Sequence, residues 1–261
     1  NPLPLEYPGA RPEHLYTNQI KPYYRAPHIL VGFPIRYIDW GWTDSTNALP
    51  EFSKRRQRAG PLVDIDGDEL DPRFGSAVTE SLFMTSRDGY TFKRWDDAFL
   101  RPGIERKHSW AYGNQYIAWH LVETKSKFEE ASNELSLYAT EGYWTSTSNQ
   151  LRRYTLRIDG FVSVNSPLSG GELLTKPLVF DGDEMVMNFS TSAAGSIQVE
   201  IQNELGAPIE GFALTDCQPV FGDSIERKVN WSNSSNLGEL AGQPLRLRFV
   251  CKDADLYSFH I

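Results

Sequence analysis

The sequence predicts an all-β protein, a partial β-propeller of two four-stranded blades followed by an antiparallel β-sandwich. Three observations support this prediction. Gly (20) and Pro (16) are plentiful and 13% of the residues are aromatic, a composition that favours many short strands joined by turns. Long apolar heptads, which would indicate helices, are absent. Finally, one motif is written twice, as YTNQI at 16–20 and as YGNQY at 112–116, which indicates that one kind of strand recurs in a repeated sheet.

The first copy of the repeat contains four predicted strands. After YTNQI (16–20) comes an apolar run, HILVGFPIRY (28–37), and then LFMTSRDGYTFKRW (82–95), which is predicted as a hairpin around a Gly turn. The stretch between about residues 39 and 75 has no counterpart in the second copy. We therefore interpret residues 39–75 as an insertion into the first blade.

The second copy follows the same plan over fewer residues. YGNQY (112–116) precedes IAWHLVE (117–123) and LSLYATEGYW (135–144). Four-stranded units that recur at this length are typical of propeller blades. The two blades are predicted to occupy residues 1–158, with the doubled motif on the inner strand of each.

Residues 159–261 are predicted to form the sandwich. Short apolar or alternating runs such as EMVMNFST, SIQVEIQ and PLRLRFV are separated by DGD, AAG and AGQP, whose Gly, Pro and Asp residues favour turns. Cys217 and Cys251 both lie in this part. They allow either a disulfide or two buried thiols, and their spacing fits no zinc site.

Charge and hydropathy narrow the range of partners. The net charge of -8 repels phosphate backbones, so we expect no nucleic-acid partner. No apolar run approaches the roughly 18 residues that a membrane span needs, so we expect no membrane partner. The chain starts at Asn1 and shows no signal peptide, which we interpret as an N-terminus that has been processed, trimmed or engineered.

Several segments resemble a known group of enzymes. RAPHILVGFPIRY, LFMTSRDGYTFKRW, ELSLYATEGYW and LRRYTLRIDGFVSV resemble the C-terminal part of five-bladed β-propeller glycoside hydrolases of the invertase and arabinanase group. That part comprises the last blades and, in the invertase branch, the β-sandwich that follows them. The resemblance implies a glycoside hydrolase-like protein that acts on a polysaccharide or oligosaccharide in an extracellular or periplasmic location.

The hairpin SRDGYTFKRW is also similar to the Asp-box of sialidases, where Ser86, Asp88, Gly89 and Thr91 match and Phe92 replaces a Trp. In sialidases this motif is structural, so it supports the fold and not a reaction.

The resemblance has two departures that leave catalysis open. Only two of five blades are present, which makes the missing N-terminal half, or a second chain that completes the propeller, the expected partner besides carbohydrate. The Asn-Asp-Pro-Asn-Gly, Arg-Asp-Pro and Glu-Cys signatures of the invertase branch, which carry its catalytic carboxylates, are absent from this sequence. The alternative to an enzyme is therefore a non-catalytic carbohydrate-binding or assembly module.

Glycoside hydrolysis usually needs two carboxyl groups about 5–9.5 Å apart. The predicted inner strands contain no Asp or Glu, so the candidates lie at strand ends: Glu80 before a strand, and Glu123 and Glu141 at the ends of strands. Each could reach the rim of a cleft as acid or base, and each could equally be a solvated strand-end carboxylate.

The inner strands offer amides as substrate-binding candidates. Asn18, Gln19, Asn114 and Gln115 could bind sugar hydroxyls or could bond the backbone of neighbouring strands and fix the blades together. Successive side chains of a strand point to opposite faces, so we expect only one of each pair to face the axis.

The segment YYRAPH adds three further candidates. Tyr24 could line the substrate pocket, Arg25 could bind the carboxylate or sulfate of an acidic sugar, and His28 could transfer protons. The alternative is structural, with Arg25 bridging two blades and His28 at a strand start.

The insertion contains aromatic, basic and acidic groups. Trp40 and Trp42 could stack on sugar rings or pin the loop, and SKRRQR (53–58) is predicted to be a solvated stretch or an anionic-glycan patch. The run DIDGDELD is a candidate structural calcium site, because carboxylate oxygens at such spacing suit Ca²⁺; the alternative is an exposed acidic turn. The candidate ligands are Asp64, Asp66, Asp68 and Asp71. No other cofactor is expected.

Overall fold

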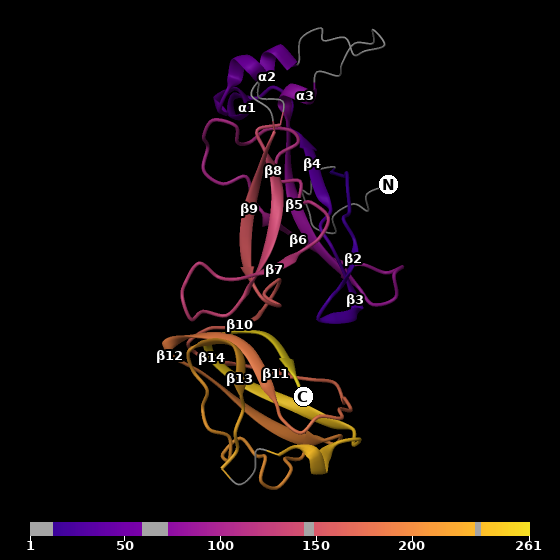
Figure 1. Ribbon diagram of the computed structural model, residues 1–261, viewed down its shortest axis with the longest axis vertical. Coiled ribbons are helices and arrows are strands. Elements are labelled where there is room, and N and C mark those ends of the chain that lie inside the picture. Colours follow the sequence, from indigo (N-terminus) through magenta and orange to yellow (C-terminus); the bar gives the residue numbers. More distant parts are fainter. Residues whose placement is uncertain (1–12, 59–72, 144–148, 233–235) are drawn as a thin grey trace. The chain divides into compact units, whose positions relative to one another are not determined.

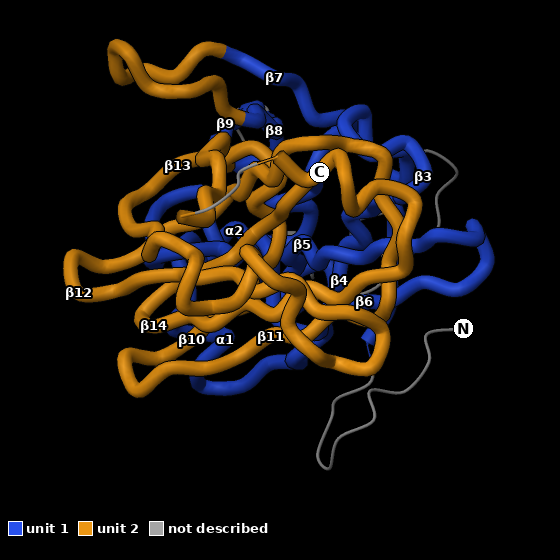
Figure 2. The backbone as a smooth tube through the Cα atoms, turned by 90° about the horizontal axis from the view of Figure 1, so that it is seen from below, with its two compact units in different colours: residues 1–124, 135–155 blue, residues 125–134, 156–261 orange. Residues whose placement is uncertain are grey.

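The computed structural model describes residues 13–58, 73–143, 149–232 and 236–261, and it confirms an all-β fold (Figure 1). The chain divides into two compact units (Figure 2). The first unit comprises residues 1–124 and 135–155, and the second comprises residues 125–134 and 156–261.

The first unit contains a six-stranded antiparallel sheet with the order β1-β4-β5-β3-β2, in which β6 pairs with the other edge of β5. Its strands are β1 (His14–Leu15), β2 (Lys21–Tyr23), β3 (Ala26–Gly32), β4 (Ile35–Asp39), β5 (Ala77–Ser86) and β6 (Lys93–Leu100).

Backbone hydrogen bonds show that these six strands belong to four neighbouring stretches of the chain, here called passes. Phe33 donates its amide to the carbonyl of Asn18 at 2.7 Å, and Ile35 donates to Thr17 at 2.9 Å. The segment from β1 to β2 therefore pairs with the segment from β3 to β4. That second segment pairs with one edge of β5, and β6 pairs with the other edge of β5. This is the four-strand order that the sequence predicted for the first blade.

The turn between β5 and β6 is built by the Asp-box residues. The Asp88 carboxylate accepts hydrogen bonds from the backbone amides of Tyr90 (2.9 Å) and Thr91 (2.7 Å), and the Ser86 hydroxyl accepts one from Gly89 (2.9 Å). Gly89 has φ +76°, which glycine adopts without strain. The hydrogen bonds to these amides lower the pKa of Asp88 to about 2.

The second sheet differs from its prediction, because the described residues form three strands and not four. These are β7 (Val122–Thr124), β8 (Glu134–Glu141) and β9 (Gln150–Arg157), in the order β7-β8-β9. Residues 115–118 extend the β7 pass along β8, since Gln115 donates its amide to Thr140 at 2.8 Å and Ala118 donates to Tyr138 at 2.7 Å.

The doubled motif therefore does not occupy equivalent strands. YTNQI lies on the outer pass of the first sheet, whereas YGNQY opens a pass that bonds directly to the central strand β8. The Gln of both copies has a positive φ (Gln19 and Gln115), so it does not account for the difference. Around the second copy Trp110, Gly113 and His120 have positive φ as well, so residues 108–121 turn repeatedly instead of forming an extra extended strand. The arrangement of the two sheets as propeller blades stays a prediction.

The insertion folds into three short helices, α1 (Asp44–Ala48), α2 (Phe52–Arg58) and α3 (Arg73–Ser76), which lie together at one end of the first unit (Figure 1). The Thr43 hydroxyl caps α1 by accepting a bond from the Thr46 amide at 3.1 Å. Ser76 donates its hydroxyl to the Asp39 carboxylate at 2.6 Å, so the two ends of the insertion meet. The acidic run with Asp64, Asp66, Asp68 and Asp71 lies outside the described residues.

In the second unit the described residues form a five-stranded antiparallel ladder with the order β10-β14-β12-β13, in which β11 also pairs with β14. Its strands are β10 (Val164–Ser166), β11 (Gly171–Leu174), β12 (Val186–Asn203), β13 (Asp223–Lys228) and β14 (Leu245–His260), with a short 3₁₀ helix at Gly238–Leu240. The pairing of β12 with β14 shifts register between Asn188 and Phe189 and between Thr191 and Ser196. Such irregularities bend strands, which lets both halves of each long strand contribute to one hydrophobic core.

Cys217 and Cys251 are both buried free thiols in the core of the second unit. Burial raises the pKa of the Cys251 thiol to about 11, and burial also raises the pKa of Cys217. The two cysteines therefore act as small apolar side chains, and the disulfide alternative is wrong. Separately, none of the helices in the described parts of the chain is long and apolar enough to cross a membrane.

Candidate functional site

The candidate site is a cavity of about 110 Å³ in the first unit. It lies where the end of the first sheet that carries β2 and β3 meets the bend that precedes β7. Its lining is Gln19, Lys21, Pro22, Tyr23, Tyr24, Val31, Phe33, His120 and Leu121. An apolar floor with a few polar groups is the composition that small-molecule pockets share.

Two chain segments that are distant in sequence are tied together at this cavity. The indole N–H of Trp119 donates to the carbonyl of Ile20 at 3.2 Å. The ring of Trp119 lies 5.6 Å from that of His120 with an interplanar angle of 27°, so the two rings stack. His120 has φ +107°, an unusual backbone conformation that directs the bend.

The polar groups at the cavity come from both segments. The Lys21 ammonium lies 2.9 Å from Nδ1 and 2.7 Å from Nε2 of His120, and 5.8 Å from the centre of the Trp119 ring. The Tyr24 hydroxyl donates to the Glu123 carboxylate at 2.6 Å. Trp119 is 59% exposed and Tyr24 is 49% exposed, so two large aromatic side chains stand open to solvent beside polar groups.

The predicted acid and base candidates do not form a facing pair of carboxylates across this cavity. Glu123 adjoins it through Tyr24 but is not among the lining residues. Glu80 accepts hydrogen bonds from Nε of Arg36 at 2.8 Å and from its Nη2, in an ion-pair network that also joins Glu13 to Arg94. Glu80 is thus engaged within the first sheet.

Glu141 is a buried structural carboxylate. It accepts bonds from Arg106 (2.8 Å), Arg152 (2.7 Å) and Tyr154 (3.0 Å). Burial, the largest influence, raises its pKa, but the hydrogen bonds from Arg152, Arg106 and Tyr154 outweigh burial and hold the pKa below its usual value. A carboxylate kept ionised in this way cannot serve as a general acid near neutral pH.

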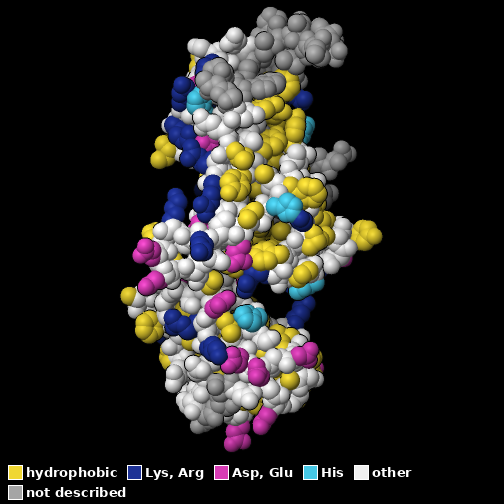
Figure 3. All heavy atoms as spheres, in the orientation of Figure 1, with side chains coloured by type: hydrophobic (Ala, Val, Ile, Leu, Met, Phe, Trp, Pro, Cys, Tyr) yellow, Lys and Arg dark blue, Asp and Glu magenta, His cyan; other side chains and the backbone are white. Residues whose placement is uncertain are grey.

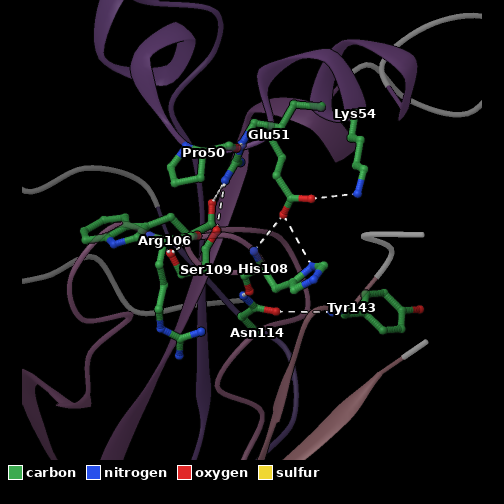
Figure 4. A network of polar contacts seen from close by, with 10 residues as sticks. Pro50, Glu51, Lys54, Arg106, His108, Ser109, Asn114 and Tyr143 are labelled. Atoms are coloured by element: carbon green, nitrogen blue, oxygen red, sulfur yellow. Dashed lines mark hydrogen bonds and ion pairs between the residues drawn. The ribbon is translucent and has the colours of Figure 1, made fainter. Parts of the chain in front are cut away.

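The four amides of the doubled motif have different surroundings. Gln19 lines the cavity, whereas Asn18 is exposed and contributes its carbonyl to the first sheet. Asn114 is completely buried: its Nδ2 donates to the carbonyl of His108 at 2.7 Å, and its Oδ1 accepts the Tyr143 amide at 3.4 Å (Figure 4). Gln115 is 1% exposed. The second motif thus fixes backbone segments, and only the first reaches the cavity.

The loop before Asn114 is anchored to the insertion through Arg55 and through Glu51, and the contacts of Glu51 are drawn in Figure 4. Arg55 is 1% exposed and donates to the carbonyls of Pro50 (2.9 Å), Ser109 (3.3 Å) and Trp110. SKRRQR is therefore not solvated throughout, because Arg55 is buried, whereas Ser53, Arg56 and Gln57 are exposed as expected. A guanidinium has five donors, enough to satisfy several carbonyls at once.

Glu51 completes this anchor by accepting the His108 amide at 2.7 Å and the Lys54 ammonium at 2.8 Å. Burial, the largest influence, raises the pKa of Glu51, but the hydrogen bonds from Lys54 and His108 outweigh it and lower the pKa overall. The anchor holds the insertion helices against the loop that carries the second motif.

The remaining candidates lie away from the cavity lining. Trp42 is covered by the Arg56 guanidinium at 3.8 Å, which matches the alternative that it pins the loop. Trp40 is 44% exposed and follows β4 at the end of the sheet where the helices lie, whereas β2 and β3 reach the other end (Figure 1). Arg25 and His28 are exposed but do not line the cavity.

The structure adds Lys21, Tyr23, Trp119 and His120 to the site, none of which the sequence singled out. A weak signal was present, because each copy of the motif is followed within a few residues by basic and aromatic side chains, in IKPYY and in IAWH. Most residues of the cavity lining thus follow the motif in sequence, and only Gln19 belongs to it.

The two copies of the motif meet in a cluster of tyrosines. The Tyr16 ring lies 6.2 Å from that of Tyr112 and 6.4 Å from that of Tyr116, both edge-on, and 5.3 Å from that of Tyr37. Burial is the main cause that raises the pKa of Tyr112 to about 12, and burial also raises the pKa values of Tyr37 and Tyr116.

The surface of the first unit is divided by side-chain type. In Figure 3 hydrophobic side chains gather on the side of the first unit over β4 and β5, and Lys and Arg side chains gather on the side toward β9 and α2.

No group of three or more His, Cys, Asp or Glu side chains in the described parts of the chain could hold a metal ion. The predicted calcium ligands fall outside those parts, so the calcium site stays a prediction.

Comparison with known proteins gave one similar structure. No family model matches the chain, and no match was found among curated proteins. Among solved structures, the chain is similar to a glycoside hydrolase family 43 arabinoxylan arabinofuranohydrolase from Bacillus subtilis, solved in complex with cellotetraose, with 12% sequence identity and a TM-score of 0.24. The alignment covers 94% of this chain and 53% of that one, so this chain spans about half the length of the protein that it matches.

Proposed function

We propose that this chain is a carbohydrate-active protein that binds a polysaccharide or oligosaccharide at the cavity beside Trp119. The observation that carries the proposal is the exposure of Trp119 and Tyr24 next to the polar side chains of Gln19, Lys21 and His120. Flat aromatic rings can cover the C–H face of a sugar, and amide and hydroxyl groups can both donate to and accept from its hydroxyls. The resemblance of RAPHILVGFPIRY and LFMTSRDGYTFKRW to propeller glycoside hydrolases supports the same ligand class.

The geometry favours binding over hydrolysis at this cavity. Of the residues that the structure describes, none of those lining the cavity has a carboxylate, whereas glycoside hydrolysis usually needs two. Glu123 is engaged by the Tyr24 hydroxyl, and Glu80 by Arg36. The function that the site supports best is therefore that of a non-catalytic carbohydrate-binding module.

A glycoside hydrolase is the second candidate, and Glu123 is the observation in its favour. Its carboxylate lies next to the cavity, within a hydrogen bond of Tyr24, where it could act as acid or base. The second carboxylate would then come from another part of a longer protein or from a second chain. An extracellular or periplasmic location is proposed with either candidate, because carbohydrate polymers are found there.

Binding can be tested with the purified chain by affinity gel electrophoresis and calorimetry against xylan, arabinoxylan, glucuronoxylan, arabinan and pectin. Trp119→Ala is expected to weaken binding at least about tenfold, equivalent to about 1.4 kcal/mol, because it removes the exposed ring. Trp40→Ala is the matched control, since Trp40 is an exposed Trp of the same unit but follows β4 at the other end of the sheet, whereas Trp119 contacts the lining residues Lys21 and His120, and the control is expected to bind like the wild type.

Absence of binding to every glycan, or equal loss of affinity in Trp119→Ala and Trp40→Ala, would contradict the proposed binding site. Release of reducing sugar from the same panel distinguishes the two candidates. We expect none from this chain alone, and turnover that disappears in Glu123→Gln would favour the hydrolase.

A further inference from the structure

The cavity beside Trp119 carries a positive charge, although the protein as a whole is negatively charged. The protein as a whole has a net charge of -8. Yet of the described side chains that line the cavity, only Lys21 carries a fixed charge, and it is positive. A cavity that concentrates the opposite sign to the rest of the molecule attracts anions locally.

No described carboxylate neutralises the Lys21 ammonium. Among the described residues no carboxylate lies within ion-pair distance of Lys21, and its polar contacts are with the two ring nitrogens of His120, at 2.9 Å and 2.7 Å. An ammonium has three donors, whereas a neutral imidazole offers one acceptor. Lys21 therefore keeps donors available for a ligand.

Three neighbouring groups restrict the anion that fits. Trp119 stacks on His120 and is 59% exposed, so a flat or ring-shaped ligand can lie next to the charge. Gln19 and Tyr24 supply uncharged polar groups on the same lining. The one ammonium acts as a point charge, which suits a single anionic group on the ligand and does not impose the two-pronged geometry of a guanidinium.

From these contacts we propose that the ligand is an acidic sugar whose carboxylate, as in a uronic acid, binds Lys21 and His120. The inference deepens the carbohydrate-binding function proposed above and rests on it. The carboxylate accepts from the Lys21 ammonium and from an N–H of His120, and the ring of the sugar lies against Trp119.

The test uses calorimetry on the intact chain with two ligands of equal length, an oligogalacturonate and its methyl ester. The ester keeps every ring and hydroxyl but removes the charge. We expect the acid to bind at least tenfold more tightly than the ester, and Lys21→Met, which keeps the length of the side chain, to abolish this difference. Added salt is expected to weaken binding of the acid and to leave the ester unchanged.

Lys93→Met is the matched control variant. The Lys93 ammonium also lies over a Trp ring, 4.8 Å from the centre of Trp95, but on β6 and outside the cavity lining. We expect Lys93→Met to keep the preference for the acid. An equal loss of preference in both variants would mean that overall charge, and not the cavity, selects the ligand, and would overturn the inference.

Two further outcomes separate the inference from the function beneath it. If the chain binds the ester, or unsubstituted xylo-oligosaccharides, as tightly as the acid, the acidic-sugar inference is wrong and carbohydrate binding stands. If the chain binds neither charged nor neutral glycans, the acidic-sugar inference and the proposed carbohydrate-binding function are both wrong. Tighter binding of a sulfated oligosaccharide than of the uronate would overturn the assignment to a carboxylate.

Discussion

At the scale of single residues, the described part of the first unit is held by charged groups placed inside it. Arg55 bonds carbonyls of two separate segments from a buried position, and Glu141 receives hydrogen bonds from Arg106, Arg152 and Tyr154. A buried ion is stable only when its partners replace the water that it loses. Arg55, predicted to be solvated, and Glu141, a candidate acid or base, therefore both have structural contacts in the first unit.

Glu141→Gln is expected to lower the free energy of unfolding by about 2 kcal/mol at pH 7, because charge-assisted hydrogen bonds are replaced by neutral ones. The folded-state pKa of Glu141 lies below its usual value of 4.5, so its contribution is fully present above pH 4.5 and is lost as the pH falls through the folded-state pKa. Urea unfolding of wild type and variant at pH 7 and pH 3 measures this. A difference between the two proteins that stays constant with pH would show that the charge of Glu141 contributes nothing.

At the scale of elements, the two copies of the motif differ at the residue between Tyr and Asn. Gly113 stands in the second copy where Thr17 stands in the first. Gly113 has φ +82°, and a Cβ built on it would overlap the ring of Tyr143. The second copy thus turns tightly before it pairs with β8, whereas residues 16–18 of the first copy bond along residues 33–35, although the Gln of both copies has a positive φ (Gln19 +48°, Gln115 +58°).

Gly113→Ala is expected to destabilise the protein by about 3 kcal/mol, because it combines a strained backbone with a clash. Gly103→Ala is the matched control, since Gly103 has a similar φ of +77° but open space around its Cα, and it should cost only about 1 kcal/mol. Thermal and urea unfolding measure both. Equal effects of the two substitutions would show that the Tyr143 ring gives way and that only φ matters.

At the scale of the whole molecule, each of the two units has buried apolar side chains of its own. Leu82 is fully buried in the first unit, and Ile197 is fully buried in the core of the second. Burial of apolar surface is the main stabilising contribution in each.

We expect Ile197→Ala to cost about 2–5 kcal/mol and to reduce amide hydrogen-exchange protection within 156–261. Leu82→Ala should do the same within the strands of the first unit. Hydrogen exchange followed by mass spectrometry resolves the two regions. Equal loss of protection in both units from either substitution would contradict the division of the chain at residue 155.

The sequence by itself determined the all-β class, the four-pass order of the first sheet and the Asp88 turn, because these depend on alternation and turn chemistry over short distances. It also named Gln19, Tyr24 and Glu123 separately as candidates, and the structure places Gln19 and Tyr24 on one cavity lining with Glu123 bonded to Tyr24. Tertiary structure alone decided that Trp119 and His120 join Lys21 at one cavity, that Asn114 and Arg55 are buried, and that the second copy of the motif is a turn. These outcomes depend on contacts between segments that are far apart in the chain. Positive φ angles and backbone carbonyls decide which segments meet, and neither leaves a clear trace in the residue pattern.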